Sequence, residues 1–179
     1  MKKSFKKIAL KELAGLACSV LKKHGVEAVL TGGACVSIYS KNKYQSLDLD
    51  FVSGAAEHDT KAVRESMDEL GFKRAAEGFF ARSDCPFIIE FITPPLAVGR
   101  EPVKKTVTIR TRSGRLRLLS PTDCVKDRLA AYYHWNDRQS LDQALMVAKN
   151  RKIDLKEVKR WSKNEGQLDK YPDFLKRLK

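Results

Sequence analysis

A short stretch between residues 30 and 52 joins a glycine pair to two aspartates, and it constrains the fold more than any other part of the chain. It contains L-T-G-G-A-C-V-S-I-Y-S, a polar connection, and then S-L-D-L-D-F-V. The apolar residues 28–31 are typical of a buried strand, the glycine pair ends that strand, and A-C-V-S-I-Y continues as a helix. Residues 47–52 form a second apolar strand. This order predicts a sheet with helices packed on it.

The two aspartates lie on one face of the second predicted strand. Side chains alternate across a strand, so Asp48 and Asp50 point to the side opposite Leu49. Neighbouring carboxylates repel each other unless a cation neutralises them, and hard oxygen ligands suit Mg²⁺ or Mn²⁺. We expect a divalent metal here; the alternative is an edge strand whose acids are solvated.

A third acid, Glu90, interrupts the apolar run F-I-I-E-F-I. Burying an unpaired carboxylate is costly, so something must compensate its charge. A cation shared with Asp48 and Asp50 would do so, and the alternative is a salt bridge to Arg82. The first explanation predicts that Glu90 lies on a strand beside the two aspartates, with its carboxylate on the same face.

The glycine pair Gly32-Gly33 is predicted to lie at the start of a helix. Phosphates bind where backbone N–H groups are free and no Cβ intrudes, and the positive end of the helix dipole favours them. Two glycines alone are a weak signal. Their position one strand before the aspartates predicts that phosphates held there share a metal with Asp48 and Asp50.

The remaining periodicity predicts an α/β core over residues 1–119 and a helical region over 120–179. Apolar residues three or four apart predict helices, S-P-T-D at 120–123 is a helix start, and alternating runs predict strands. We expect helices over 6–24, 59–70, 121–135, 140–150, 154–164 and 172–178, strands over 72–75, 79–82 and 87–92, and a β-hairpin over 107–119.

Composition indicates a folded protein with a basic surface. Hydrophobic residues make up 42% and charged residues 32%, which leaves little room for long disorder. No apolar run is long enough to span a bilayer and the N-terminus lacks the apolar segment of a signal peptide, so we expect a cytoplasmic protein without a membrane partner. Four scattered cysteines in apolar surroundings are expected to be reduced.

The formal net charge is +13, and several of the positive residues cluster in the predicted hairpin. If Ser113-Gly114 is a two-residue turn, Arg112 pairs with Arg115 and Arg110 with Arg117, which places four guanidinium groups on one face. A bound nucleic-acid backbone would relieve their repulsion, and the alternative is that solvent and counterions screen these arginines.

The motif G-G-A-C-V-S-I-Y-S followed by S-L-D-L-D-F-V resembles the signature of the polymerase-β-like nucleotidyltransferase superfamily, and within it the bacterial proteins related to the AbiEii toxins. The resemblance covers roughly residues 25–150 and implies a mixed β-sheet flanked by helices, with a helical region after it. It implies that an NTP substrate and Mg²⁺ or Mn²⁺ are bound by the following residues: Gly32, Gly33, Ser46 and Arg128 for the nucleotide, and Asp48, Asp50 and Glu90 for the metal and catalysis.

Three functions are compatible with these features. The first is a metal-dependent transferase that moves a nucleoside monophosphate from an NTP to a hydroxyl on RNA, such as a tRNA, or on protein, in a toxin–antitoxin or defence setting. The second is a catalytically silent protein of the same fold that binds RNA or a partner such as an antitoxin. The third, an aminoglycoside-type transferase, is disfavoured because its cationic substrate predicts an acidic acceptor pocket, whereas this chain has a net positive charge.

Overall fold

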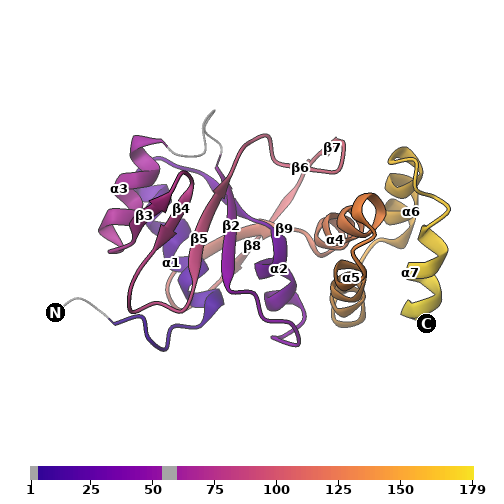
Figure 1. Cartoon of the computed structure of the whole chain (residues 1–179), viewed down its shortest axis with the longest axis horizontal. Helices are drawn as coiled ribbons and strands as arrows, with labels where there is room; N and C mark the ends of the chain where they lie inside the picture. The colour runs from indigo at the N-terminus through magenta and orange to yellow at the C-terminus, as the bar shows by residue number, and fades with distance from the viewer. Residues whose placement is uncertain (1–3, 54–59) are drawn as a thin grey trace.

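The computed structural model describes residues 4–53 and 60–179, and it shows a mixed β-sheet flanked by helices with further helices at the C-terminal end (Figure 1). The helices are α1 (Leu10–Lys23), α2 (Gly32–Tyr39), α3 (Lys61–Glu69), α4 (Pro121–Trp135), α5 (Arg138–Asn150), α6 (Leu155–Asn164) and α7 (Tyr171–Leu178). The strands are β1 (Ala28–Leu30), β2 (Asp48–Ser53), β3 (Lys73–Ala76), β4 (Phe79–Ala81), β5 (Ile88–Ile92), β6 (Ala97–Val98), β7 (Glu101–Pro102), β8 (Thr106–Arg110) and β9 (Arg115–Leu119).

Seven strands form one sheet in the order β3-β4-β5-β2-β1-β9-β8. β2 pairs with β5 and β1 pairs with β9 in parallel, whereas the other neighbours are antiparallel. The predicted fold class, a mixed sheet with flanking helices, is confirmed. Leu30 of β1, Phe51 of β2 and Ile89 of β5 are fully buried. The hydrophobic core therefore packs against these three central strands.

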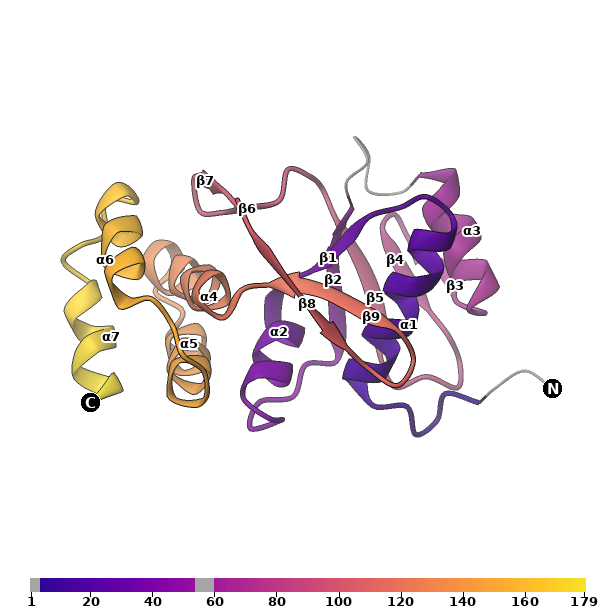
Figure 2. The ribbon, with the colours of Figure 1, turned by 180° about the vertical axis from the view of Figure 1, so that it is seen from behind.

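Helix α1 begins four residues later than the periodicity predicts. Phe5 is buried and contacts Phe72, and the Ile8 N–H donates to the Phe5 carbonyl, so residues 5–8 form a turn that anchors the chain before the helix starts. The helix ends as predicted, because Gly25 follows it with φ +77°. Seen from behind, α1 lies across the sheet beside β8 and β9 (Figure 2).

Helix α3 begins at Lys61, with Thr60 as its N-cap. The Thr60 hydroxyl accepts a hydrogen bond from the Val63 N–H at 3.2 Å. The predicted start at Asp59 lies outside the described residues. Val63 and Met67 are fully buried, as the helical spacing predicts.

The β8–β9 hairpin is present, but its predicted register is wrong. Arg110 pairs with Arg115 and Thr108 with Arg117, so residues 111–114 form a four-residue connection in place of a two-residue turn. The Thr111 N–H donates to the Gly114 carbonyl at 2.8 Å, which closes this longer loop. Arg112 therefore lies in the loop and has no cross-strand partner.

Only helices follow β9, as predicted from residue 120 onward. Ser120 caps α4 by accepting a hydrogen bond from the Asp123 N–H at 3.0 Å. Tyr133 of α4 stacks on Trp161 of α6 with ring centroids 5.7 Å apart, and both are buried. The short β6–β7 ribbon was not predicted, because two-residue strands carry no alternation. The division into two domains at residue 120 stays a prediction.

Residues 4–53 and 60–179 include no helix with both the length and the apolar character needed to cross a membrane. All four cysteines are free, and Cys18, Cys35 and Cys124 are buried. Burial raises the pKa of the Cys18 thiol to about 11, so it is uncharged at neutral pH.

Candidate functional site

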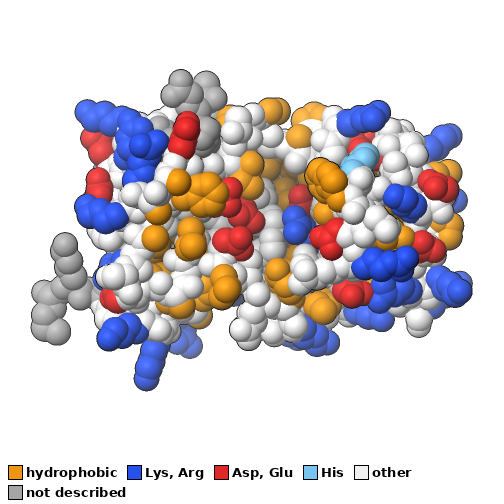
Figure 3. Space-filling view, viewed as in Figure 1, with side chains coloured by type: hydrophobic (Ala, Val, Ile, Leu, Met, Phe, Trp, Pro, Cys, Tyr) orange, Lys and Arg blue, Asp and Glu red, His pale blue; other side chains and the backbone are white. Residues whose placement is uncertain are grey.

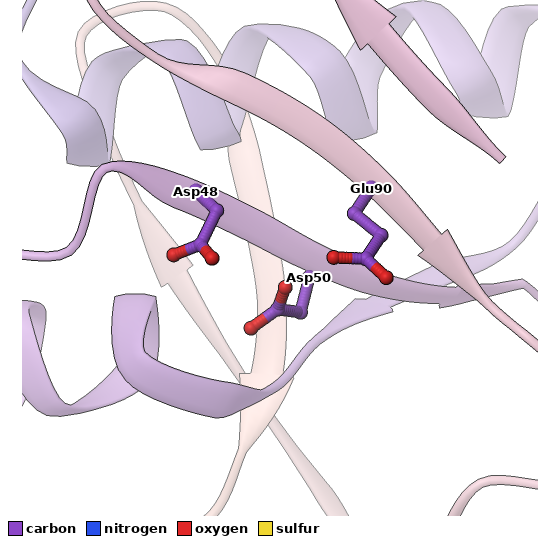
Figure 4. Close-up of side chains that lie close together, drawn as sticks. All are labelled: Asp48, Asp50 and Glu90. Atoms are coloured by element: carbon purple, nitrogen blue, oxygen red, sulfur yellow. The ribbon is translucent and has the colours of Figure 1, made fainter. Parts of the chain in front are cut away.

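Three carboxylates converge on one face of the sheet (Figure 4). Asp50 on β2 lies opposite Glu90 on the parallel strand β5, and Asp48 lies two residues before Asp50 on the same face. Ligand oxygens of the three residues all lie within 4.8 Å of one another. The predicted arrangement, with Glu90 beside the aspartates and on their face, is confirmed.

The carboxylates repel one another and are partly removed from water. Burial, then the charges of Asp48 and Glu90, raise the pKa of Asp50 to about 7. Burial and the Asp48 charge also raise the pKa of Glu90. An acidic cluster of this kind is stabilised by a cation, and three oxygen donors at this spacing fit a hard divalent ion such as Mg²⁺ or Mn²⁺.

Gly32 brings the start of α2 directly against Asp50. It has φ +62°, and a Cβ at this position would lie 1.9 Å from Asp50 Oδ2. The preceding residue is fixed as well, because the Thr31 N–H donates to the Asp50 carbonyl at 2.8 Å. Only glycine therefore fits here without moving the carboxylate. The glycine turn opens at the end of the sheet where the carboxylates lie, as predicted.

Ser46 links the glycine turn to the first aspartate. Its hydroxyl donates to Asp48 Oδ1, and a Cβ on Gly33 would lie 2.8 Å from that hydroxyl. The Ser46 N–H donates to Ser37 Oγ at 2.9 Å, and Ser37 in turn donates to the Gly33 carbonyl at 3.2 Å. Ser46 is buried, so it fixes the orientation of Asp48.

Arg128 of α4 faces the same site from the helical region. Its positive charge acts on Asp50 and lowers the pKa of that carboxyl, against the larger effect of burial. Its guanidinium is held by Asp127, with Nε at 3.0 Å and Nη2 at 2.6 Å from Oδ2. Binding of phosphate by Arg128 stays a prediction.

Glu90 is less buried than the apolar run around it suggests. Ile89 and Phe91 point into the core, whereas Ile88 and Ile92 are 45% and 37% exposed. Glu90 thus lies on the open face of β5, and the expectation of a carboxylate inside the core is wrong. Arg82, its alternative partner, pairs instead with Asp84 and stacks over Phe5.

Exposed apolar side chains surround the carboxylates on this open face. Phe79 lies opposite Glu90 on β4 and is 40% exposed. In the space-filling view, red acidic side chains gather with orange hydrophobic ones beside the hollow between the sheet and the C-terminal helices (Figure 3). The site is therefore an acidic centre with an apolar rim, open to solvent.

Three residues of the site were not predicted from the sequence. Ser37 connects Gly33 to Ser46, Asp127 orients Arg128, and Thr31 fixes the Asp50 backbone. The position of Asp127 next to Arg128 is a signal that the sequence offers. Ser37 and Thr31 act through contacts that depend on how α2 packs on β2, and no pattern in the sequence reveals them.

The four hairpin arginines are not equivalent. Arg110 and Arg115 are exposed and directly opposite each other, and Arg112 is exposed in the loop. Arg117 differs, because its Nη1 lies 2.9 Å from Glu27 Oε2 and its Nε donates to Thr106 Oγ1 at 2.7 Å. Within residues 4–53 and 60–179, only three of the four predicted arginines, Arg110, Arg112 and Arg115, lack an ion pair, and Arg112 lies outside the strands.

Comparison with solved structures supports this description of the fold. The chain is similar to an antigenic nucleotidyltransferase-like protein from Paracoccidioides brasiliensis, with a TM-score of 0.57 and 12% identity over 80% of this chain and 78% of that chain. No protein-family profile matches the sequence, and no curated protein matches it significantly. The fold is nucleotidyltransferase-like.

Proposed function

We propose that this protein is a metal-dependent nucleotidyltransferase that moves a nucleoside monophosphate from an NTP to a hydroxyl group. The observation that carries the proposal is the convergence of Asp48, Asp50 and Glu90 within 4.8 Å, directly against a glycine turn at a helix N-terminus. One site thus offers carboxylates for a cation and backbone donors for phosphate.

In the proposed reaction, the acceptor oxygen forms a bond to the α-phosphorus while the bond from that phosphorus to the bridging oxygen of the β-phosphate breaks, and pyrophosphate leaves. Bound Mg²⁺ or Mn²⁺ would neutralise the triphosphate and polarise the phosphoryl group. Asp48 and Asp50 would hold the cation, and Glu90 would either complete that ligand set or take the proton of the acceptor hydroxyl. Burial and the Asp48 charge raise the pKa of Glu90, which makes its carboxylate a stronger base than an exposed one.

The other residues position the nucleotide. The N–H groups at Gly32 and Gly33 bind phosphate oxygens, Arg128 adds a positive charge that acts on Asp50, and Ser46 keeps Asp48 in its orientation. The exposed ring of Phe79 offers an apolar surface for the base or sugar.

The biological setting is a further part of the proposal. The resemblance of G-G-A-C-V-S-I-Y-S and S-L-D-L-D-F-V to AbiEii-related proteins supports a toxin–antitoxin or defence role, with an RNA or protein acceptor and an antitoxin-type partner. The +13 charge favours RNA.

Incubation with each labelled NTP, Mg²⁺ and total tRNA tests the activity. Wild-type protein is expected to label the RNA, and Asp48→Asn is expected to reduce the label at least about 100-fold, because nucleotidyl transfer depends on charge neutralisation at the phosphates. Asp169→Asn, at an exposed position outside the site, is the matched control and should retain full activity. Equal labelling by wild type and Asp48→Asn would contradict the proposal.

Calorimetry separates the enzyme from a silent protein of the same fold. The wild type is expected to bind Mg²⁺ together with at least one NTP, and Asp48→Asn to lose this binding. If neither protein bound any NTP in the presence of Mg²⁺, the silent RNA- or protein-binding function would replace the one proposed here.

A further inference from the structure

A basic groove lies between α1 and the connection of β8 and β9, on elements that contribute nothing to the carboxylate site. Its volume is about 460 Å³, and its lining includes four cationic side chains: Lys22, Arg110, Arg112 and Arg115. Figure 2 shows α1 next to this hairpin. Ser19 and Thr111 also line the groove.

The charge of this groove is not compensated within the protein. None of its four cations forms an ion pair or a side-chain hydrogen bond with any residue in 4–53 or 60–179. Elsewhere many surface cations are paired, as Arg117 is with Glu27 and Arg177 with Asp142. Arg110 and Arg115 even lie opposite each other across the strands, an arrangement that costs stability.

The groove is also built with close contacts. A Cβ on Gly15 of α1 would lie 2.3 Å from Thr111 Oγ1, and one on Gly114 would lie 1.9 Å from Ser19 Oγ. These two glycines let the hairpin loop approach the helix backbone. The Ser113 N–H donates to Glu12 Oε2 at 3.0 Å, which fixes the loop on α1. The cations are therefore held on a preformed frame.

We propose that this groove binds the phosphodiester backbone of a nucleic acid. Guanidinium groups bind phosphate oxygens in a bidentate manner, and several adjacent phosphates match several adjacent cations. The residues that line the groove in the described parts of the chain include no large apolar side chain and no acid, which disfavours insertion into a membrane or packing of an amphipathic helix.

The nucleic acid bound in this groove would carry the acceptor hydroxyl for the carboxylate site. This connection between the two sites rests on the proposed function. Binding itself does not depend on catalysis. The groove uses α1, β8 and β9, whereas the carboxylates use β2 and β5. Binding can therefore be measured without Mg²⁺ and without NTP.

The test compares two triple variants that lose the same charge. Arg110→Gln/Arg112→Gln/Arg115→Gln removes three groove cations, and Lys156→Gln/Lys159→Gln/Lys163→Gln removes three exposed cations from α6 as the matched control. Fluorescence anisotropy at several salt concentrations would follow labelled 20-nucleotide RNA and DNA of the same sequence. Vesicles containing phosphatidylserine form a third arm.

The groove variant is expected to bind RNA at least about 10-fold more weakly, with a salt slope smaller by about 2, since three phosphate contacts are lost. The control variant should keep nearly the wild-type slope. Equal binding of RNA and DNA supports recognition of the phosphodiester backbone alone. Tighter binding of RNA than of DNA also supports the proposal and identifies RNA as the ligand. Equal slopes for the two variants, no binding by the wild type, or arginine-dependent binding to vesicles only would overturn the proposal.

Two further variants keep the outcome interpretable. The groove variant should unfold at the wild-type temperature or above, because it removes like-charge repulsion between Arg110 and Arg115. If it fails to fold, Lys22→Gln/Arg112→Gln changes no strand residue and is expected to lower the salt slope by about 1. Asp48→Asn should bind RNA as the wild type does, which distinguishes failure of the groove from failure of the active site.

Discussion

Asp50→Asn is expected to stabilise the metal-free protein at pH 8 and to abolish its binding of Mn²⁺. Burial and two neighbouring acids raise the pKa of Asp50 in the folded state to about 7. In the unfolded chain it returns to about 3.9. The carboxyl group is thus protonated more readily in the folded state, and it contributes stability below pH 4 that is lost as the pH rises through 7. Asparagine never ionises and avoids this loss.

The size of the effect follows from the shift in pKa. One unit corresponds to about 1.4 kcal/mol, so a shift of roughly three units sets an upper bound of about 4 kcal/mol. Asp50 is not fully enclosed, and its side chain can relax. We therefore expect the asparagine variant to be more stable than the wild type by about 2 kcal/mol at pH 8 in the absence of metal.

Urea denaturation in EDTA at pH 5 and pH 8 measures this difference. The wild type should lose stability between the two pH values, and Asp50→Asn should lose less. In buffer without EDTA, Mn²⁺ at pH 8 should raise the unfolding temperature of the wild type but not of Asp50→Asn, because only the intact carboxylate set binds the ion. Asp169→Asn is the control for loss of an acid elsewhere. The same pH dependence in the wild type and Asp50→Asn would contradict the raised pKa.

Much of the site could be predicted because it depends on strand periodicity. Two-residue alternation places Asp48 and Asp50 on one face whatever the neighbouring strands are. The glycine pair lies one helix earlier in the chain, and its proximity to Asp50 follows once β1 and β2 are neighbours. The α/β fold followed from the same alternation and from helical spacing.

Features that depend on register and on strand order could not be predicted. The arginine pairing depends on whether the hairpin connection has two or four residues, and S-G within T-R-S-G is compatible with both. The run F-I-I-E-F-I is typical of burial on both faces, but within residues 4–53 and 60–179 the face that Ile88 and Ile92 share with Glu90 is open, and these isoleucines are 45% and 37% exposed. Sequence alone does not show which face of a strand the helices cover.

Gly32→Ala is expected to disable the site while leaving the fold largely intact. The added Cβ would lie 1.9 Å from Asp50 Oδ2 and 2.9 Å from Asp50 Cγ, so the carboxylate must rotate away from Asp48 and Glu90. The backbone at φ +62° adds strain of about 1 kcal/mol for any residue with a Cβ. Crowding adds roughly 1–3 kcal/mol if Asp50 moves only in part.

Gly25→Ala separates the two contributions. Gly25 has φ +77° and no heavy atom within 4 Å of an added Cβ, so its substitution introduces the backbone strain alone. Both variants should lose about 1 kcal/mol from strain in urea denaturation, and Gly32→Ala should lose more. In Mn²⁺ titrations, Gly25→Ala should match the wild type, whereas Gly32→Ala should bind at least about 10-fold more weakly, as expected when one carboxylate ligand is displaced. Wild-type Mn²⁺ affinity in Gly32→Ala would show that the glycine turn and the carboxylates do not form one site.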